Sequence, residues 1–395
     1  MSKTNRQIAI IGLGYVGFPL FKNFSNKLLC WGVDSDPLKI AHLKKEYPRL
    51  MVTSNWLDVK DCDFYIVAVP TPIDKKNNPD ITPLKVVCRE LANVIGRGDI
   101  IVFESTVFPG ATEEICIPIM ETLSGLKINK DFYVGYSPER INVGDKTHQL
   151  HNTPKIVSAT DDKMANLIKN VYETILSAEV VIASSIKVAE AAKMYENVQR
   201  DVLIALANEF SEYCRIEGID IRAVTECASS KWNFSKVNPG LVGGHCIAVD
   251  PFYLIDRASK KGMELTLVKT AREINEHKPE IVAKRIETIL GNQRNDKEPQ
   301  QVLFLGITYK PNIADCRNTK IPDVIHLLES KGITIDVYDP IADKEYLINE
   351  YNVRLISEQE LKQRAYDMVI QMVNHAVFES MHLGNYNIIN LNELL

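Results

Sequence analysis

A short apolar run, QIAII at residues 7–11, leads directly into the glycine-rich stretch GLGYVG at residues 12–17, and helical periodicity follows. This succession predicts a strand, a tight turn and a helix. Each glycine meets a steric need, since Gly12 permits the turn, Gly14 lets the backbone approach a pyrophosphate, and Gly17 allows close packing of helix on strand. The free N–H groups at the start of the helix suit phosphates. The stretch therefore predicts a dinucleotide site.

A second apolar run, LLCWGVD, ends at Asp34, about 20 residues after the first glycine. A carboxylate at this distance can bind the hydroxyls of the adenosine ribose. Asp36 follows it and no arginine stands beside it, so a 2′-phosphate would be repelled and NAD is favoured over NADP. Lys39, one turn further on, can reach the adenosine ribose or the pyrophosphate; the alternative is a solvated lysine.

Further apolar runs alternate with segments long enough for crossover helices, which is typical of a doubly wound parallel sheet. These runs are residues 64–70, 99–105, 131–137, 154–159 and 180–184. From Ile186, helical periodicity continues without glycine until Gly218, which predicts a helix of roughly 45 Å. A helix longer than a domain is wide is expected to connect two domains, and its apolar face can pair with a second subunit.

After the polar stretch 291–300, which reads as a linker, a second α/β series begins. Its expected strands are residues 301–310, 333–339, 367–373 and 387–391, and its expected helix is residues 321–331. We therefore expect an α/β protein with two Rossmann-like doubly wound lobes, joined by a long central helix and a helical middle domain. The predicted domains are an NAD-binding Rossmann domain at 1–185, a central helical, dimerisation domain at 186–292 and a C-terminal α/β domain at 293–395.

Composition excludes several classes of protein. The net charge of −5 gives no electrostatic reason to bind nucleic acid or an anionic membrane. No stretch resembles a signal peptide or a run of about 18 apolar residues. The eight cysteines are scattered, without CxxC spacing and without the paired cysteines and histidines of a zinc motif, which argues against a structural zinc site. The sequence predicts a cytoplasmic protein with reduced thiols, no metal, and no membrane or nucleic-acid partner.

The stretch NPGLVGGHCIAVDP, residues 238–251, raises the question of what Cys246 does. Gly243 and Gly244 allow the backbone to approach a ligand closely. The residues alone leave two interpretations open, a small core residue and a nucleophile whose thiolate is favoured by a nearby cation. His245 suggests a cysteine–histidine pair of the hydrolase type, but neighbours in an extended chain point to opposite sides, which disfavours that pairing.

Three further residues are candidates for chemistry. Lys193 and Asn197 are four residues apart on the predicted long helix, so they project from the same face. A cation and an amide aimed at one point can stabilise an oxyanion, although solvated side chains are the alternative. Glu139, in YSPERINVGDK, follows a strand-like run, where a site at the edge of a sheet would lie; an exposed loop glutamate is the alternative.

Seven motifs in order along nearly the whole chain resemble those of the UDP-sugar 6-dehydrogenases, in the UDP-glucose/UDP-mannose dehydrogenase superfamily. Within that family, the chain is most similar to the branch that oxidises UDP-N-acetylhexosamines, closest to the enzymes for UDP-N-acetylglucosamine and UDP-N-acetylgalactosamine. The motifs are IIGLGYVGFPL, VPTPID, ESTVFPGATEE, YSPERINVGDK, AEAAKMYEN, KWNFSKVNPGLVGGHCIAVDPFYL and LGITYKPNIADCRNTK.

The resemblance implies an NAD-dependent, four-electron oxidation of a sugar C6 hydroxyl to a carboxylate, for the synthesis of surface polysaccharide precursors such as those of a capsule. A first hydride transfer gives an aldehyde that cysteine holds as a hemithioacetal, a second gives a thioester, and water releases the acid. The implied catalytic residues are Cys246 as nucleophile, Lys193 and Asn197 as oxyanion-stabilising pair, Asp250 as the carboxylate at the catalytic water, Glu139 as base for thioester hydrolysis and Thr106 near the nicotinamide.

The resemblance also implies binding residues and a homodimer or higher oligomer. The implied cofactor contacts are Gly12, Gly14, Tyr15, Val16, Gly17, Asp34, Lys39, Thr71, Thr106 and Arg317. The implied substrate contacts are Glu139, Arg140, Lys193, Asn197, Gly243 and Lys310. In the second, UDP-sugar-binding lobe, Lys310 is expected to face the substrate and Arg317 the cofactor phosphates, at a cleft between the lobes.

The branch assignment rests mainly on GGHCIAVDP, since Val249 stands where glucose-specific members have lysine. Val143, Ala248 and Pro311 depart from the branch pattern and leave the choice of sugar epimer open. UDP-N-acetylmannosamine or UDP-glucose as substrate is one alternative, and a two-electron dehydrogenase without need of a thiol is another. An alternative of another class is a catalytically silent regulator that binds NAD or a nucleotide sugar.

Overall fold

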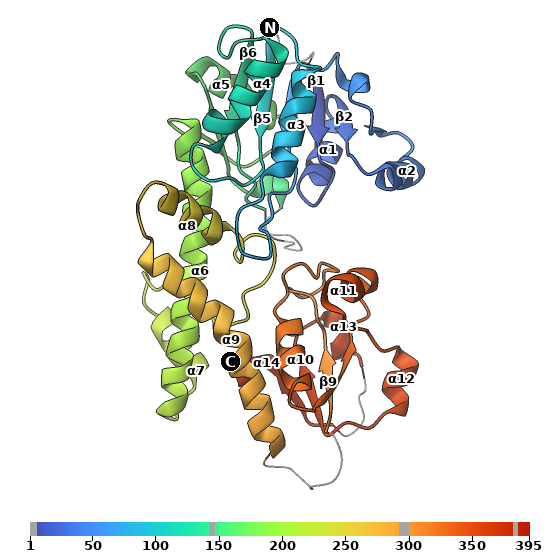
Figure 1. Ribbon diagram of the computed structural model, residues 1–395, viewed down its shortest axis with the longest axis vertical. Helices are drawn as coiled ribbons and strands as arrows, with labels where there is room; N and C mark the ends of the chain where they lie inside the picture. The colour runs from blue at the N-terminus through green and yellow to red at the C-terminus, as the bar shows by residue number, and fades with distance from the viewer. Residues whose placement is uncertain (1–5, 142–146, 148, 292–299, 382–385) are drawn as a thin grey trace. The chain divides into compact units, whose positions relative to one another are not determined.

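The structure is a computed structural model that describes residues 6–141, 147, 149–291, 300–381 and 386–395 (Figure 1). Val143, and most of the expected linker at 291–300, lie outside the described residues. The chain divides into two compact units, which we describe separately. Unit 1 comprises Met1–Glu196 and Phe252–Lys260, and unit 2 comprises Asn197–Pro251 and Lys261–Leu395.

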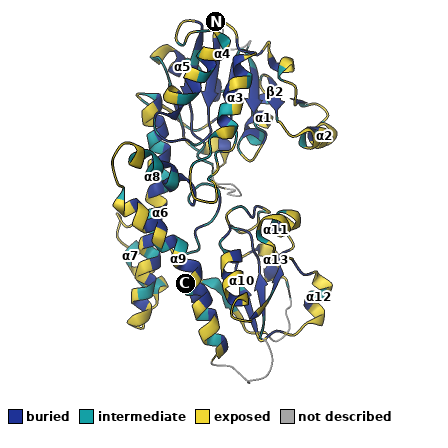
Figure 2. Cartoon of the chain, viewed as in Figure 1, coloured by how far each residue is buried: buried dark blue, intermediate teal, exposed yellow. Residues whose placement is uncertain are grey.

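Unit 1 contains an eight-stranded sheet of order β3-β2-β1-β4-β5-β6-β7-β8. Its strands are β1 Gln7–Ile11, β2 Leu29–Val33, β3 Met51–Thr53, β4 Phe64–Val67, β5 Asp99–Phe103, β6 Phe132–Tyr136, β7 Lys155–Ala159 and β8 Val180–Ile182. The central strands are apolar and buried almost throughout, as the dark blue of Figure 2 shows. Strands of this kind belong to parallel sheets covered on both faces by helices.

The helices of unit 1 follow the strands in alternation. They are α1 Gly17–Ser25, α2 Pro37–Glu46, α3 Thr82–Ala92, α4 Ile117–Ser124 and α5 Asp162–Tyr172, with short helical turns η1 Trp56–Val59, η2 Thr112–Cys116 and η3 Leu150–Asn152. Side-chain caps fix where some of them begin. The Asp161 carboxylate, for example, accepts a hydrogen bond of 2.8 Å from the Met164 N–H at the start of α5.

The sheet departs from the predicted all-parallel arrangement at one pair. β7 runs antiparallel to β6, with Gly135 opposite Ala159 and Tyr136 opposite Ser158. A parallel neighbour needs a crossover connection, usually a helix, and the described part of the segment between these strands holds only the short η3.

Strand β3 was not predicted from the sequence, because three residues carry too little periodicity to be recognised.

Five adjacent parallel strands end in register. Ile11 pairs with both Val33 and Val67, Val67 pairs with Phe103, and Phe103 pairs with Tyr136. The residues that follow these strand ends therefore meet along one edge of the sheet. The order reverses at β1, between β2 and β4, which is where such sheets bind ligands.

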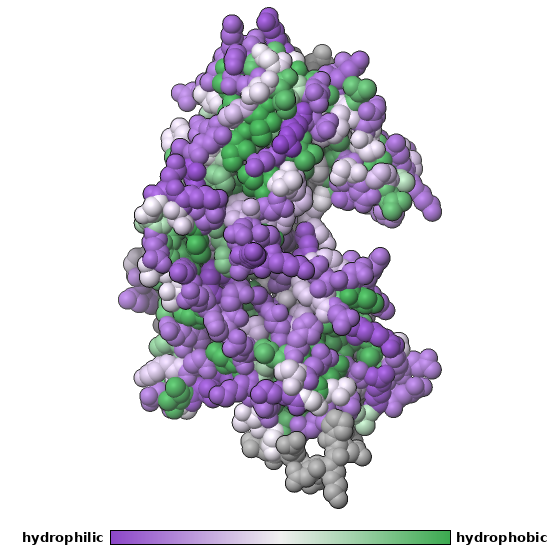
Figure 3. Space-filling model, viewed as in Figure 1, coloured by the Kyte–Doolittle hydropathy of each residue, from purple (hydrophilic) through white to green (hydrophobic). Residues whose placement is uncertain are grey.

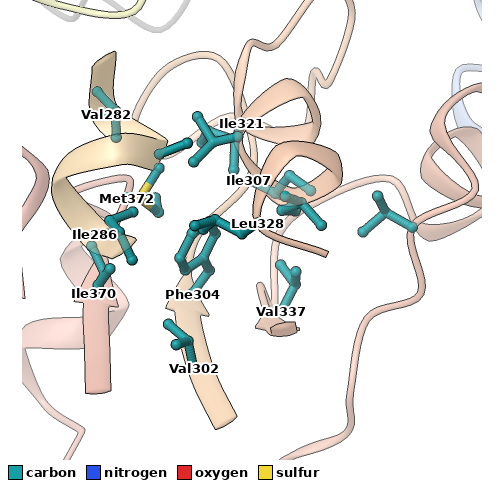
Figure 4. Packing of buried hydrophobic residues seen from close by; sticks show 14 of the residues in the cluster. Val282, Ile286, Val302, Phe304, Ile307, Ile321, Leu328, Val337, Ile370 and Met372 are labelled. Carbon is teal, nitrogen blue, oxygen red and sulfur yellow. The ribbon is translucent and has the colours of Figure 1, made fainter. Parts of the chain in front are cut away.

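Unit 2 contains a four-stranded parallel sheet of order β10-β9-β11-β12. Its strands are β9 Gln301–Leu305, β10 Thr334–Tyr338, β11 Met368–Gln371 and β12 Ile388–Asn390, and its later helices are α10 Ile321–Glu329, α11 Lys344–Tyr351, α12 Glu358–Gln363, α13 Ala376–Glu379 and α14 Leu391–Leu394. In Figure 4, Phe304 of β9 packs among Ile286 of the preceding helix, Leu328 of α10 and Ile370 of β11. This core holds the second sheet together.

The predicted long helix is present as α6, Ile186–Ile216, whose 31 residues span roughly 46 Å. It begins in unit 1 and ends in unit 2. Helices α7 Ile221–Ser229, α8 Asp250–Lys260 and α9 Thr266–Gly291 complete the helical middle region. The fold class is thus confirmed: two Rossmann-like sheets with a long helix and a helical middle region. The domain boundaries given above stay a prediction.

Hydrophilic side chains predominate on the visible face of the molecule, and apolar ones gather in separate groups (Figure 3). Among the described residues, none of the helices combines the length and the hydropathy that a membrane crossing requires.

Candidate active site

The turn between β1 and α1 has the geometry that a pyrophosphate needs. Gly12 has φ +90°, and a Cβ there would lie 2.8 Å from the carbonyl oxygen of Ala68. A Cβ at Gly17 would lie 1.8 Å from the oxygen of Gly12, so only glycine fits there. Beside Gly14, by contrast, no heavy atom of the described residues lies within 4 Å of such a Cβ. The open space at Gly14 is suitable for a phosphate.

Asp34 follows β2 at the same edge of the sheet. Its carboxylate accepts hydrogen bonds from the Leu13 N–H at 2.9 Å and from the Asp36 N–H at 3.1 Å, and it forms an ion pair of 2.8 Å with Lys39 Nζ. Partial burial would raise the pKa of Asp34, but the bonds from Lys39 and the backbone outweigh it and lower that pKa. Asp34 is therefore an anion at the place where the ribose is expected, and Lys39 is bound to it rather than free in solvent.

Asp36 has a different role from Asp34. Its carboxylate caps the N-terminus of α2 by accepting hydrogen bonds from the N–H groups of Leu38 and Lys39 at 2.9 and 3.2 Å. The two aspartates thus have different structural roles. Asp34 binds the backbone of the glycine turn, and Asp36 caps α2. In the glycine turn itself, Tyr15 is 48% exposed, and Val16 is the N-cap residue of α1.

The loops after β4 and β5 are tied together. Thr71 Oγ1 donates a hydrogen bond of 2.7 Å to the carbonyl oxygen of Thr106, and Ser105 Oγ donates one of 2.7 Å to that of Val69. Thr106 itself is partly exposed. The two predicted threonines are therefore brought together at the carboxyl edge of the first sheet.

A buried charged cluster lies next to these loops. The Lys155 ammonium is 3.1 Å from Glu104 Oε2 and 3.8 Å from Glu139 Oε2, and the Tyr172 hydroxyl donates a hydrogen bond to Glu104. The side chains of Glu104, Lys155 and Glu139 are 0, 5 and 12% exposed. Glu139 is therefore not an exposed loop residue, because it faces a buried cation. Its Oε1 accepts hydrogen bonds from the backbone N–H groups of Arg140 and Ile141 at 2.7 and 2.5 Å.

The cluster predicts a pH-dependent stability. Burial raises the pKa of Glu104 to about 7, more than Lys155 lowers it. Because the folded protein then holds this proton to a higher pH than the unfolded chain, the contribution is present at low pH and is lost as pH rises through about 7. We expect Glu104→Gln to flatten the fall in unfolding free energy between pH 5 and 8 by roughly 1–3 kcal/mol, measured by urea titration. An unchanged pH slope would contradict the assignment, and exposed Glu113→Gln is the matched control.

Arg140 has protein partners for its guanidinium. It forms an ion pair of 2.8 Å with Glu196 and donates a hydrogen bond of 3.0 Å to the carbonyl oxygen of Pro154. Its side chain is 30% exposed. If Arg140 contacts the substrate, its guanidinium therefore binds the substrate and Glu196 at the same time.

Helix α6 carries the predicted lysine and amide. Lys193 belongs to unit 1 and is 7% exposed, and Asn197, one turn later, belongs to unit 2. Asn197 Nδ2 donates a hydrogen bond of 2.5 Å to the Asp250 carboxylate, which is 2% exposed. Asp250 in turn begins α8, and its N–H donates to the carbonyl oxygen of Cys246 at 2.9 Å. Asn197, Asp250 and the cysteine turn thus form one connected group.

The cysteine loop lies against the loop that follows β9. A Cβ at Gly243 would lie 2.6 Å from the oxygen of Asn318, and one at Gly244, with φ +84°, would lie 2.8 Å from the Tyr309 ring. Asn318 Nδ2 also donates a hydrogen bond of 3.2 Å to the oxygen of Gly244. The glycine pair is therefore needed for the contact of the two loops. Cys246, two residues after Gly244, is partly exposed.

The conformation of this loop corrects one expectation from the sequence. Residues 244–249 form consecutive turns, in which the Val249 N–H donates a hydrogen bond of 3.0 Å to the Cys246 oxygen. The chain is thus not extended here, and the alternation expected to separate His245 from Cys246 does not apply.

The loop after β9 carries the two predicted residues of the second lobe. The carbonyl oxygen of Lys310 accepts a hydrogen bond of 2.9 Å from Thr308 Oγ1, and the Lys310 side chain is half-buried. Arg317 Nε and Nη2 donate to the two carboxylate oxygens of Asp315 at 2.9 and 2.7 Å. Arg317 is thus anchored by a carboxylate that is not among the residues predicted from the sequence.

Within unit 1 the structure assembles Gly12, Gly14, Gly17, Asp34, Lys39, Thr71, Thr106 and Glu139 at one sheet edge; within unit 2 it assembles Asn197, Gly243, Cys246, Asp250, Lys310 and Arg317 around two loops. Sequence reasoning missed Glu104, Lys155 and Asp315. Charged residues at the ends of apolar strand runs were the available signal for the first two. No group of histidine, cysteine and acidic residues in the described part of the chain is arranged to hold a metal ion.

The first sheet and its glycine turn are those of a Rossmann-type dinucleotide-binding protein, here with a second Rossmann-like sheet. The chain belongs to the UDP-glucose/GDP-mannose dehydrogenase family: residues 45–176 match its NAD binding domain, 187–277 its central domain and 303–391 its UDP binding domain. It is thus an NAD-dependent enzyme that oxidises UDP-sugars, which confirms the predicted family, cofactor and class of substrate.

Relatives of similar length support this membership. UDP-N-acetyl-D-glucosamine 6-dehydrogenase of Pseudomonas aeruginosa is 40% identical over 96% of this chain and 93% of its own. The enzyme of the same name from Salmonella typhi is 43% identical over 95% of this chain and 91% of its own. Among solved structures, the UDP-D-ManNAc dehydrogenase of Pyrococcus horikoshii superposes with a TM-score of 0.86 at 26% identity, over 98% of this chain and 99% of that one.

Proposed function

We propose that the chain oxidises the C6 hydroxyl of a UDP-N-acetylhexosamine, UDP-GlcNAc or UDP-GalNAc, to a carboxylate through a covalent thioester on Cys246. The observation that carries the proposal is the placement of this thiol: it is partly exposed, on a turn whose carbonyl is bonded to Asp250, itself bonded to Asn197. NAD, held by the glycine turn and Asp34, supplies the chemistry of hydride acceptance in both oxidation steps.

A thiol is required because of the electron count. Oxidation of an alcohol to an aldehyde removes two electrons, but an aldehyde has no hydroxyl-bearing carbon from which a second hydride can leave. Addition of the Cys246 thiolate to C6 forms a sulfur–carbon bond and moves the carbonyl π electrons to oxygen. The resulting tetrahedral carbon can lose a hydride and become a thioester. We assign the Lys193 ammonium and the Asn197 amide to the alkoxide oxygen in this step.

Release of the acid requires water and a base. Water attacks the thioester carbon, the carbon–sulfur bond breaks, and the electron pair returns to sulfur as thiolate. We assign Asp250 to the orientation of this water and Glu139 to the acceptance of its proton. Glu139 faces the Lys155 ammonium at 3.8 Å, so the proposed base lies beside a buried cation. Thr106, at the neighbouring strand end, is assigned to the same water.

The UDP end of the substrate is assigned to the loop after β9, at the strand-order reversal of the second sheet. Lys310 supplies a cation for the diphosphate. Gly243, which allows the loop after β9 to approach the cysteine turn, is assigned to the substrate through its backbone. Arg140 is assigned to the substrate as well. Arg317 is assigned to the cofactor phosphates, with one side of its guanidinium held by Asp315.

The choice of an acetamido sugar is supported by the names of the two relatives at 40 and 43% identity. It is tested by kcat/KM with NAD for UDP-GlcNAc, UDP-GalNAc, UDP-ManNAc and UDP-glucose. We expect UDP-GlcNAc or UDP-GalNAc to exceed the other two by at least about tenfold. A buried polar group loses its partner when the acetamido group is missing, as in UDP-glucose, or points the other way from C2, as in UDP-ManNAc, at a cost of ~1–3 kcal/mol. A preference for UDP-glucose would reject the branch assignment, and a preference for UDP-ManNAc would reject the choice of epimer. Binding without turnover would favour a regulator.

A homodimer is also part of the proposal. Four large apolar side chains on the second half of α6 are strongly exposed, namely Leu206, Phe210, Tyr213 and Ile216 at 59, 42, 52 and 79%. Such a row on one helix is typical of a surface that a second copy of the chain covers. Sedimentation equilibrium of the wild type and of Phe210→Lys tests this, since a monomeric wild type would reject it.

Asp34→Asn is expected to relax the preference for NAD. The substitution removes the negative charge that repels a 2′-phosphate but leaves a side chain that can still accept the bond from the Leu13 N–H. We expect the ratio of the Kd for NADP to the Kd for NAD to fall about tenfold, or ~1.4 kcal/mol, in a fluorescence titration. Asp36→Asn, which keeps the cap of α2, is the matched control and should leave the ratio unchanged. Equal effects of the two variants would reject the assignment of Asp34.

A further inference from the structure

We infer that His375 is a positioning residue for the UDP end of the substrate, and that its neutral ring, with the proton on Nε2, holds the loop that carries Lys310. The inference rests on the proposed assignment of UDP to the loop after β9 and deepens it. His375 follows β11, and all the residues involved belong to unit 2. The loops after β9 and β11 border the strand-order reversal of the second sheet, where such sheets bind ligands.

The His375 ring joins three strand ends. Its Nε2 lies 3.1 Å from Asp339 Oδ2, after β10, and 3.2 Å from Thr308 Oγ1, after β9. Its Nδ1 accepts a hydrogen bond of 2.8 Å from the Asn312 N–H, further along the same loop as Thr308. The His375 side chain is 0% exposed, and the Phe378 ring packs against it with 5.4 Å between the ring centroids. The ring is therefore a buried and fixed part of this edge of the sheet.

The partners fix the tautomer of this histidine. A backbone N–H can only donate, so Nδ1 is an unprotonated acceptor. Burial would raise the pKa of Asp339, but the hydrogen bonds from His375 and from the Ile307 N–H outweigh burial and lower that pKa, so an anion faces Nε2. The Thr308 hydroxyl donates its own proton to the carbonyl oxygen of Lys310 at 2.9 Å. Nε2 therefore carries the proton, and the ring is neutral.

A second hydrogen bond completes the connection between the loops after β9 and β11. Asn312 Oδ1 accepts a hydrogen bond of 2.9 Å from the Ala376 N–H, while the N–H of Asn312 donates to His375. Asn312 has φ +61°, a left-handed conformation that asparagine adopts more readily than most residues. Its exposed side chain and the buried imidazole thus form a reciprocal clamp across the two loops.

The clamp holds the loop on both sides of Lys310. Thr308, two residues before the lysine, is bonded to the Lys310 carbonyl oxygen and faces His375 Nε2. Asn312, two residues after the lysine, is bonded to Nδ1 of the same ring. Affinity for a diphosphate is greater where the backbone of the binding cation is fixed before the ligand arrives. His375 therefore acts on the affinity for UDP through the position of Lys310, without touching the substrate.

The test is a calorimetric titration of two His375 variants with UDP. Asparagine places Oδ1 where Nδ1 lies, so His375→Asn keeps the acceptor for the Asn312 N–H. Glutamine places its amide near the position of Nε2, so His375→Gln keeps the donor to Asp339 and loses that acceptor. We expect His375→Gln to raise the Kd for UDP at least about tenfold, and His375→Asn to raise it less than about threefold. With the preferred UDP-sugar, His375→Gln should raise KM by a similar factor with a smaller change in kcat.

Asn312→Gly tests the exposed half of the clamp. It removes the acceptor for the Ala376 N–H and keeps the left-handed backbone, because glycine adopts positive φ freely. We expect it to raise the Kd for UDP about threefold or more. Asn352→Gly, at an exposed asparagine with φ +55° that follows α11, is the matched control and should leave this Kd unchanged. Thermal unfolding followed by circular dichroism shows whether each variant is folded.

Equal affinities for UDP in the wild type and His375→Gln would overturn the inference. Equal losses in the two His375 variants would also overturn it, since the ring would then only fill the core. If His375→Gln does not fold, an unchanged Kd in Asn312→Gly overturns the inference instead. A wild type that does not bind UDP would reject the assignment of UDP to this loop, and the inference with it. UDP bound equally well by the wild type and every variant would reject only the role of His375.

Discussion

Cys246→Ser is expected to reduce steady-state NADH formation from the preferred UDP-sugar by about three orders of magnitude or more. A serine hydroxyl is far less acidic than a thiol and leaves far less readily from an acyl carbon, so both the second oxidation and the hydrolysis are impaired. Because the first hydride transfer does not use sulfur, single-turnover experiments should still show up to one NADH per active site. Stopped-flow absorbance of NADH separates this first phase from steady-state turnover.

Cys227→Ser is the matched control for that experiment. Cys227 lies on α7 and is exposed, and the proposed mechanism gives it no role. This variant should retain wild-type turnover. Near-normal turnover in Cys246→Ser would exclude a thioester and would favour a two-electron dehydrogenase.

Arg272→Met is expected to lower the free energy of unfolding by about 3–5 kcal/mol, because it leaves a buried carboxylate without its cation. Arg272 on α9 is 2% exposed, and its Nη1 donates a hydrogen bond of 2.6 Å to Asp201 on α6, which is 0% exposed. Asn275 Nδ2 donates to the same carboxylate at 2.8 Å. The pair lies one helical turn after Asn197, so its loss should also disturb the helix that carries the proposed oxyanion amide.

Urea denaturation at pH 7 measures this loss, with two comparisons. The double variant Asp201→Asn/Arg272→Met removes the stranded charge and should recover a large part of the stability. Arg222→Met breaks an exposed pair, with 67 and 48% exposed side chains, and should cost less than about 1 kcal/mol. Burial raises the pKa of Asp201, so the loss in Arg272→Met should shrink as pH falls and the carboxyl takes up its proton. Equal losses for the two single variants would contradict the account.

The strands of both sheets were largely predictable because their apolar runs are flanked by glycine or acidic residues, and the long helix because its periodicity continues without interruption. The direction of β7 was not predictable, since it depends on how the segment after β6 returns and not on the strand residues themselves. Strand β3, only three residues long, was too short to recognise.

The positions of Gly12, Asp34 and Glu139 at strand ends in unit 1 could be predicted from the sequence, because parallel strands bring their carboxyl ends to one edge. Thr71 and Thr106 came from the resemblance alone. Partners from distant segments could not be predicted. Glu104 and Lys155 are 51 residues apart, and His245 is 72 residues from Arg317, so only the fold brings each pair together. The resemblance supplied roles for Cys246, Asp250 and Arg317 that spacing alone did not, and the structure adds Asp315, which anchors both Arg317 and His245.

The most direct test of the central claim is the number of NADH molecules formed per molecule of UDP-GlcNAc or UDP-GalNAc consumed to completion, with the product identified by mass spectrometry. The proposed mechanism predicts two NADH per sugar and a uronic acid as product, without free aldehyde. One NADH per sugar with an aldehyde or ketone as product would contradict the thioester mechanism, whichever sugar is preferred.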